Sequence, residues 1–359
     1  MAKFQRRDWG GYARHILRAT GAAAWLAAAP AYACPVCITL PEDTMADLLL
    51  GARTVALARE NPDRPYSYHV TEIIEGPPAD TEIPFLVDAS MRRRLAANPD
   101  DAVLVALSPG GDWAMLGYAK SEMRAVAADV LNRSEDWSGP SGDAARFEFF
   151  ASLLDSPDRT LQRQALTEIA RMPYALIRTV STAPPPDRIR GHLGDVNMLA
   201  YRPLLILLLA LSPRPEDAAW IVAAFDRSGT GSNDLAALAT AVIELGGAEG
   251  LDRVTNKFLA RRGTPPEATK SAITALGAIG RGGDPALRPM VATTLYRLID
   301  ERPDLAASAA TELASWSDYS QAEIVAGLIG TGLILAPDDL FALNNYVFGA
   351  ERAARGAGN

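Results

Sequence analysis

Two cysteines, Cys34 and Cys37, carry the sharpest chemical signal in this sequence, in the run Cys-Pro-Val-Cys. Three kinds of chemistry fit the spacing: a local disulfide, a redox-active dithiol, or a pair of thiolate ligands for a metal such as zinc. A disulfide is the simplest, although a loop this small would contribute only about 2 kcal/mol through chain entropy. A zinc site would need further ligands from elsewhere in the fold. Covalent haem attachment is excluded, because Ile38 stands where that motif requires histidine.

Histidines and catalytic motifs are scarce in the rest of the chain. After residue 33 only His69 and His192 remain, the first expected to face solvent on a strand and the second expected in a loop. Two histidines provide few candidate residues for a Ser-His-Asp triad or a multi-histidine metal site. No Gly-rich phosphate loop or nucleophile elbow is apparent in the sequence. We therefore predict no catalytic residue and no cofactor, and we do not expect an enzyme.

A possible calcium loop spans residues 226–237. Oxygen-bearing side chains stand at alternate positions, and Gly231 holds the sixth position, as in such loops. Ala237 replaces the bidentate glutamate expected at the twelfth position, so a capped turn between helices is the simpler interpretation. The candidate ligands would be Asp226, Ser228, Thr230 and Asp234.

The first 33 residues are typical of a secretory signal peptide. Basic residues come first and are followed by the apolar run 19–29. This run is too short to span a bilayer of about 30 Å, which needs roughly 20 apolar residues. The small residues Ala31 and Ala33 stand where signal peptidase prefers them, and cleavage after Ala33 would make Cys34 the first residue. We therefore expect a periplasmic or secreted protein.

Two variants of export stay open. Lipidation of Cys34 would make the protein a lipoprotein anchored in a membrane, although Ala31 stands where a lipobox usually has leucine. The pair Arg6-Arg7 also has a weaker similarity to a twin-arginine signal.

The charge balance argues against nucleic-acid binding. The expected signal peptide holds five of the 35 basic residues and one of the 43 acidic ones, so the remainder has a formal charge of −12. Such a surface repels phosphate backbones, whose binding depends on Lys and Arg. Apolar residues form 48% of the chain and aromatic residues only 7%, which favours a large core of closely packed helices. Two apolar runs, 204–211 and 324–336, are too short or too interrupted by glycine to span a membrane, and we expect both as buried helices.

Residues from about 53 to 119 show the two-residue periodicity of β-strands. Turn signals rich in Pro, Gly, Asn and Asp separate the candidate strands. Five strands in about seventy residues fit a small barrel, preceded by one short helix built on Met45, Leu48 and Leu49. The predicted strands are Arg53 to Arg59, Tyr66 to Glu75, Glu82 to Asp88, Ala102 to Leu107 and Trp113 to Ala119.

The order of cysteines, then a helix, then strands resembles the netrin-like and metalloproteinase-inhibitor-like domains. The resemblance covers about Cys34 to Ala119. It implies a five-stranded barrel of the oligonucleotide/oligosaccharide-binding (OB) type.

Helical patterns follow a polar boundary at 133–144. The helices predicted at 145–154 and 160–171 are joined by Asp155-Ser156-Pro157-Asp158, in which serine can cap the second helix and proline can begin it. Later segments repeat one another, at 234–247, 270–280 and 307–316. Aligning Leu276-Gly277 with Leu313-Ala314 gives a spacing of 37 residues. A period of this length, made of two helices and two short turns, is typical of a solenoid.

These segments resemble HEAT-type repeats over about 145–352, with Ala and Gly where helices would cross and Pro or Asp in the turns. HEAT-like proteins are mostly protein-binding scaffolds, so the resemblance implies a binding surface for another protein. The partner expected is another exported or membrane-associated protein.

The sequence as a whole predicts an α+β multidomain protein: a small five-stranded OB-like β-barrel followed by an α-α solenoid of HEAT-like repeats. The expected divisions are a signal peptide at 1–33, the barrel domain with flanking helices at 34–132, a linker at 133–144 and the solenoid at 145–355. The expected function is that of an exported protein-binding scaffold. The alternative is a thiol/disulfide or metal-handling protein that acts through Cys34 and Cys37.

Overall fold

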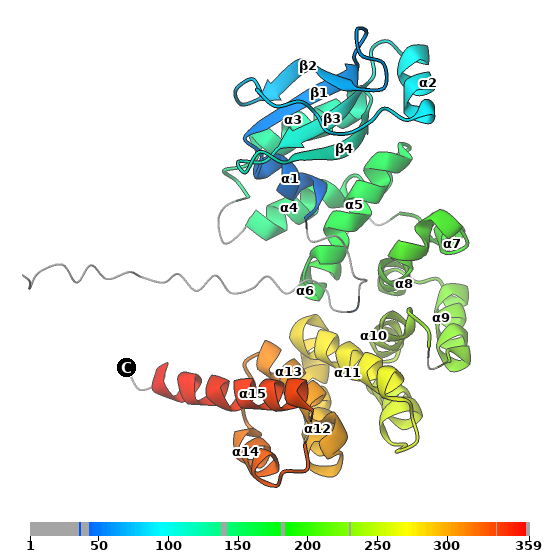
Figure 1. The fold of residues 1–359 in the computed structure, drawn as a ribbon. Helices are drawn as coiled ribbons and strands as arrows, with labels where there is room; N and C mark the ends of the chain where they lie inside the picture. Colours follow the sequence, from blue (N-terminus) through cyan, green and yellow to red (C-terminus); the bar gives the residue numbers. More distant parts are fainter. Residues whose placement is uncertain are drawn as a thin grey trace, which may run out of the picture. The chain divides into compact units, whose positions relative to one another are not determined.

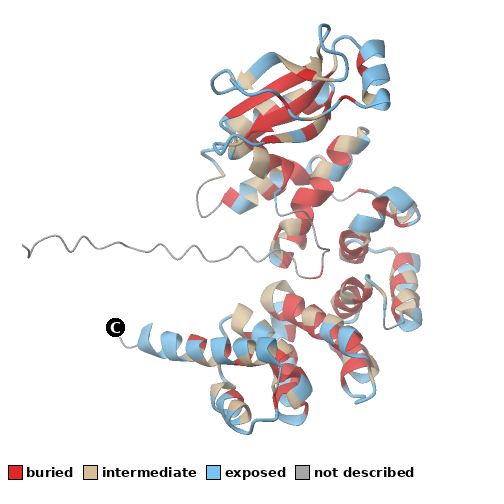
Figure 2. Cartoon of the chain, in the orientation of Figure 1, coloured by how far each residue is buried: buried red, intermediate tan, exposed pale blue. Residues whose placement is uncertain are grey.

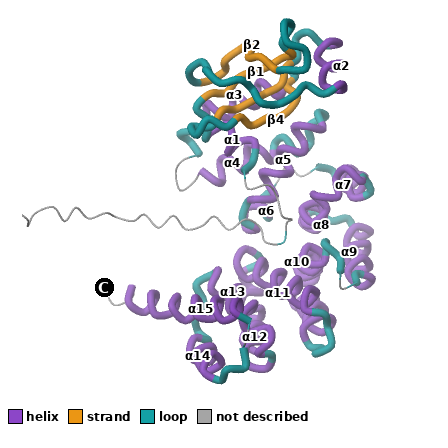
Figure 3. The backbone as a smooth tube through the Cα atoms, viewed as in Figure 1, coloured by secondary structure: helices purple, strands orange, loops and turns teal. Residues whose placement is uncertain are grey.

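The computed structural model of the chain describes residues 36, 43–137, 142–180, 184–229, 231–334 and 336–356 (Figure 1). The expected signal peptide, both cysteines and Thr230 of the possible calcium loop lie outside the described residues. The described residues all belong to one unit, 32–359. Figure 3 shows that strands are confined to the first part of this unit and that helices make up the rest.

Four strands form one open antiparallel sheet in the order β2-β1-β3-β4 (Figure 1). Their bounds are β1 Thr54–Glu60, β2 Tyr68–Glu75, β3 Ala102–Leu107 and β4 Trp113–Ala119. The outer strands β2 and β4 do not pair with each other, so the sheet has two edges. The predicted five-stranded OB-like barrel is therefore wrong, although four of the five predicted strands are present.

The missing strand was predicted at 82–88, where the chain runs beside β2 almost without pairing. A single bridge joins Ser67 to Leu86. Pro84 has no amide hydrogen to donate to a neighbouring strand. Tyr66 adopts a left-handed φ of 68°, so the extended backbone of β2 does not continue back through this residue. The segment 82–88 therefore has little extended chain beside it with which to pair. The alternation of apolar residues in this segment reflects side chains buried against one face of the sheet, not pairing within it.

Both faces of the sheet are covered by other elements. One face packs against α1 and α3, and the other packs against α2 and the segment 79–87. Side chains alternate between the faces of a strand, so Leu104 of β3 enters the first core and Val103 and Val105 enter the second. All six residues of β3 are therefore buried (Figure 2). The three helices are α1 Met45–Leu50, α2 Ala89–Ala97 and α3 Ser121–Asn132.

Beyond α3, every regular element of the described chain is helical. Helices close in sequence pack on one another, α8 on α9 and α10, α10 on α11, α11 on α12 and α13, and α13 on α15. This order of contacts is compatible with a solenoid (Figure 1). The elements are α4 Gly142–Ala151, α5 Arg159–Arg171, α6 Tyr174–Ile177, α7 Pro186–Leu193, η1 Val196–Tyr201, α8 Arg202–Leu211, α9 Pro215–Arg227, α10 Leu235–Val254, η2 Thr255–Leu259, α11 Pro266–Gly282, η3 Pro285–Leu287, α12 Arg288–Glu301, η4 Pro303–Leu305, α13 Ala306–Ser315, α14 Ala322–Gly330 and α15 Pro337–Gly356.

Two glycines of α11 allow it to lie close to the segment that begins with α13. A Cβ atom on Gly277 would lie 1.9 Å from the Glu312 carboxylate, and one on Gly280 would lie 1.5 Å from the Trp316 ring. Glycine therefore permits an approach that any side chain would block. Two of the segments that repeat one another in the sequence, 270–280 and 307–316, are thus neighbours in space.

The two long apolar runs differ in their burial. In α8 every residue from Pro203 to Ala210 is buried, as expected. Helix α14 ends at Gly330, and within it only Val325 is buried and Ile324 is exposed. Beyond its end Leu333 is exposed and Ile334 is buried, so the prediction of a buried helix at 324–336 is wrong. Among the described residues, no single helix is both long and apolar enough to cross a membrane, and one bent pair, 186–193 with 196–211, meets that criterion only when its two parts are taken together.

Candidate binding site

Of the residues that the sequence suggested for calcium, Asp226 lies in the last turn of α9, and Ser228 and Asp234 lie between α9 and α10. The Asp226 carboxylate accepts two hydrogen bonds from Arg253, at 3.0 and 3.2 Å. Asp234 is paired with Arg202 at 3.0 Å, and the Ser228 hydroxyl donates to a backbone carbonyl at 2.7 Å. Each carboxylate therefore already has an arginine partner. In the part of the chain that the structure describes, no three His, Cys, Asp or Glu side chains gather closely enough to hold a metal ion.

Each histidine of the described chain has a hydrogen-bond partner within the fold. His69 is half-buried on β2, with its Nδ1 atom 3.2 Å from the Arg59 carbonyl oxygen. His192 lies in α7 and not in a loop, so that prediction is wrong; Pro186 at the start of the helix supplies the preset φ that favours helix formation. The Gln162 amide donates to His192 Nε2 at 3.1 Å, and burial lowers the pKa of His192. Both features favour a neutral ring with a structural role.

A buried group of charges joins the sheet layer to the helices that follow. Arg146 on α4 lies 2.8 Å from Asp47 on α1 and 2.6 Å from Glu168 on α5. The Glu168 side chain is only 1% exposed and also accepts a hydrogen bond from the Ala46 amide. Burial raises the pKa of Glu168, and the neighbouring Arg146 charge opposes that effect. Because these groups bind one another, we assign them to the stability of the junction and not to a ligand.

A small cavity lies between the π-helical turn η2 and helix α12. In η2 the Ala260 amide donates to the Thr255 carbonyl, five residues back, at 2.9 Å. Turns of this kind are rare and often occur at functional sites. Arg302, which is buried, donates to the Leu259 carbonyl at the end of the turn at 3.4 Å and is held by Asp304 at 2.7 and 2.9 Å. The hydrogen bonds to Asp304 raise the pKa of Arg302 and keep it charged.

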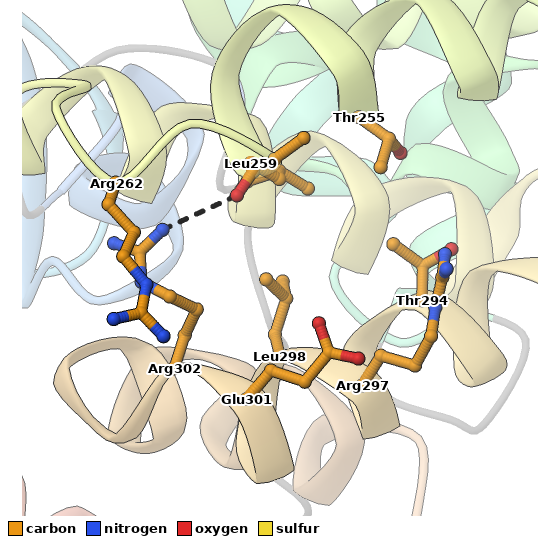
Figure 4. Close-up of a pocket in the computed structure, with 9 residues that line it drawn as sticks. Thr255, Leu259, Arg262, Thr294, Arg297, Leu298, Glu301 and Arg302 are labelled. Atoms are coloured by element: carbon orange, nitrogen blue, oxygen red, sulfur yellow. Dashed lines mark hydrogen bonds between the residues drawn. The ribbon is translucent and has the colours of Figure 1, made fainter.

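The cavity has a volume of about 170 Å³ and is lined by both polar and apolar side chains, among them three arginines (Figure 4). We call it the arginine cavity. Arg262, Arg297 and Glu301 line it from exposed positions, and none of the three forms a hydrogen bond or ion pair with another described residue. The Thr255 hydroxyl is buried in its wall and likewise has no hydrogen-bond partner there. Thr294, Arg297, Leu298 and Glu301 share one face of α12 because they are three or four residues apart.

This arrangement suits one acidic side chain. A guanidinium group binds a carboxylate through two parallel hydrogen bonds, and Arg262 and Arg297 line the cavity from opposite sides, so either one can receive it (Figure 4). Sites for drug-sized ligands usually enclose about 300–1,000 Å³, so a cavity of about 170 Å³ fits a single side chain better than a whole cofactor.

No protein-family model, no curated protein and no solved structure matches this chain. The geometry of the chain itself is therefore the basis for a proposal about its function.

Almost nothing in the sequence indicates the arginine cavity. Arg297 and Glu301 look like ordinary charges on the solvent face of a helix, and Arg262 lies in a turn. The spacing of Thr294, Arg297 and Glu301 places a hydroxyl and two opposite charges on one helix face, but this pattern is common on exposed helices. The π-helical turn that brings Thr255 to the same cavity has no recognised sequence signature.

Proposed function

We propose that the chain is an exported scaffold that binds another exported or membrane-associated protein through the surface of its helices. The arginine cavity anchors an acidic side chain of that partner. The observation that carries the proposal is one small cavity lined by two guanidinium groups, those of Arg262 and Arg297, that form no ion pair with another described residue.

The packing of the helices supports a binding role. A stack of helices buries its apolar side chains between neighbours and leaves the outer side chains available along an extended surface. The cavity offers a fixed position on that surface, because η2 and α12 are joined by the buried Arg302. The chain is acidic as a whole, so a local pair of unpaired arginines gives a selective place for a negative group.

The first experiment tests whether the cavity captures a protein. The tagged full chain and the variant Arg262→Glu/Arg297→Glu are each incubated with periplasmic extract, and bound proteins are identified by mass spectrometry. The control variant is Arg93→Glu/Arg227→Glu, which makes the same charge change at exposed arginines elsewhere. We expect one protein to be retained by the wild type and the control and to fall at least about tenfold with the cavity variant, since charge-assisted bonds contribute about 1.5–3 kcal/mol each. Equal retention by all three would refute the proposal.

The second experiment isolates the hydroxyl group. Thr255→Val keeps the shape of the side chain and removes a buried hydroxyl that has no partner. Because an unsatisfied buried polar group destabilises the fold, this change should leave the free energy of unfolding unchanged or slightly raised. Binding of the captured protein should remain unchanged, because the hydroxyl is not accessible to a partner and the guanidinium groups are kept. A loss of more than about 1 kcal/mol in stability would show that the hydroxyl is bonded within the fold.

A further inference from the structure

Helix α15 exposes a regular stripe of side chains. The stripe repeats every three and then four residues, which is the spacing at which two helices pack side by side as a coiled coil. The opposite side of the helix packs on α13 and α14 through Leu343, Tyr346 and Gly349. The exposed stripe consists of Asp338, Phe341, Asn345, Phe348, Arg352 and Arg355.

The contacts on the buried side fix which side of α15 remains open. The Tyr346 hydroxyl accepts a hydrogen bond from the Gln321 amide at 3.2 Å. A Cβ atom on Gly349 would lie 2.4 Å from the Tyr319 ring, so the glycine permits a close approach there. Rotation of α15 about its axis would break both contacts. The stripe is therefore held outward.

The end of α15 is exposed to solvent. Residues 351–356 are all exposed, and Figures 1 and 2 show this end of the helix extending beyond the helices beside it. A helix end in water gains little from its own hydrogen bonds, and most helical stability in proteins comes from packing. Phe341 and Phe348 are 69% and 57% exposed, so the stripe also leaves two aromatic rings in water. Burial of these rings would be favourable.

The order of the stripe is complementary to itself. Counted from a midpoint between residues 346 and 347, position 338 mirrors 355, position 341 mirrors 352, and position 345 mirrors 348. Two copies of α15 placed antiparallel about a two-fold axis therefore bring Asp338 opposite the partner's Arg355. They also bring Phe341 opposite the partner's Arg352, a cation–π pair. Each pair occurs twice, as a two-fold interface requires.

We propose that α15 binds α15 of a second copy of this chain in this antiparallel register. The proposal does not depend on the arginine cavity. Among the described residues, Asp338 and Arg352 form no ion pair, and the Arg355 side chain donates only to the Glu351 carbonyl of its own helix, at 3.3 Å. The charges are therefore available, and their mirror order matches a second copy of the same helix.

The test measures the self-association of the full chain by sedimentation equilibrium from about 1 to 100 µM, the range in which interfaces of modest size associate. We expect a monomer–dimer equilibrium. Asp338→Arg and Arg355→Asp should each raise the dissociation constant about tenfold to a hundredfold, because each places like charges opposite each other twice. Asp143→Arg and Arg227→Asp make the same charge changes at exposed sites elsewhere and should have no effect.

Mixing the two α15 variants gives the sharpest result. In a heterodimer of Asp338→Arg with Arg355→Asp, both mirror pairs again join opposite charges, so association should return to the wild-type level. The double variant Phe341→Ser/Phe348→Ser should abolish association without changing the circular dichroism spectrum, because both rings are exposed in the single chain. A chain that stays monomeric at about 100 µM, a dimer indifferent to these changes, or a mixture that fails to recover would each overturn the proposal.

Discussion

Glu312 provides the most specific test of the helical packing. It lies on α13, where its side chain is 13% exposed and 3.0 Å from Arg281 of α11. The absence of side chains at Gly277 leaves room for its carboxylate between the helices. Burial raises the pKa of Glu312 to about 7, and the Arg281 charge lowers it only in part.

The direction of the pH dependence follows from the two states of the chain. In the unfolded chain the carboxyl group titrates near its ordinary pKa of 4.5, and in the folded chain it titrates near 7. Between these values the unfolded state has released the proton and the folded state has kept it, so folding becomes less favourable as the pH rises. The resulting decrease in the free energy of unfolding is absent below pH 4.5, is complete above pH 7 and amounts to about 3 kcal/mol.

The variant Glu312→Gln isolates this effect, because glutamine keeps an acceptor for Arg281 and does not titrate. Urea unfolding from pH 4 to 8 should show that the stability of the variant relative to wild type rises by about 3 kcal/mol as the pH increases. Glu323→Gln, at an exposed position on α14, is the matched control and should show a flat difference. A flat difference for Glu312→Gln as well would refute the assignment of a raised pKa to this residue.

Two further predictions concern packing and the junction. Gly280→Ala should destabilise the fold by about 1–3 kcal/mol, because the added methyl group collides with Trp316. Gly327→Ala should stabilise the fold by about 0.5–1 kcal/mol, because the added methyl group meets no atom within 4 Å. Urea unfolding compares the two variants, and a change of the same sign in both would contradict the observed packing. Arg146→Met should lower the free energy of unfolding at pH 7 by about 3–5 kcal/mol, because it leaves Glu168 buried without its cation. Adding Glu168→Gln should recover part of this stability. A decrease below about 1 kcal/mol for Arg146→Met would show that Glu168 is not charged in the fold.

The strands show what local sequence can and cannot predict. The bounds of β3 and β4 were predicted correctly, because turn signals rich in Pro, Gly, Asn and Asp precede both strands and separate them from each other. The segment 82–88 carries the same alternation without being a strand. Ile83 and Val87 are buried against one face of the sheet and Leu86 is exposed, so the alternation reports burial and not hydrogen bonding. Closure of a barrel depends on that missing pairing, so it could not be inferred from the pattern.

The helices were predicted well in position and less well in their ends and environment. Helix α5 begins after Asp158, whose carboxylate accepts hydrogen bonds from two amides of the first turn, and not at Ser156-Pro157. Both choices satisfy the same rule for helix starts, so the sequence alone does not distinguish them. The exposure of Ile324 and Leu333 depends on which helices follow α13 and where they lie, which hydropathy does not encode.

A common feature of the helical crossings distinguishes their arginines from those of the arginine cavity. Acidic residues with little exposure are paired with an arginine across several crossings: Glu168 with Arg146, Glu244 with Arg178, Asp217 with Arg190, and Glu312 with Arg281. The surrounding contacts are rich in Ala and Leu, which pack almost equally well when helices slide, whereas a displaced helix would bury an unpaired charge. Such pairs therefore specify the register of the stack more than they stabilise it. Arg262 and Arg297 stand apart from this pattern, because they line a cavity and no acidic residue of the described chain pairs with them. Arginines that the fold does not use to align its helices remain available to a partner.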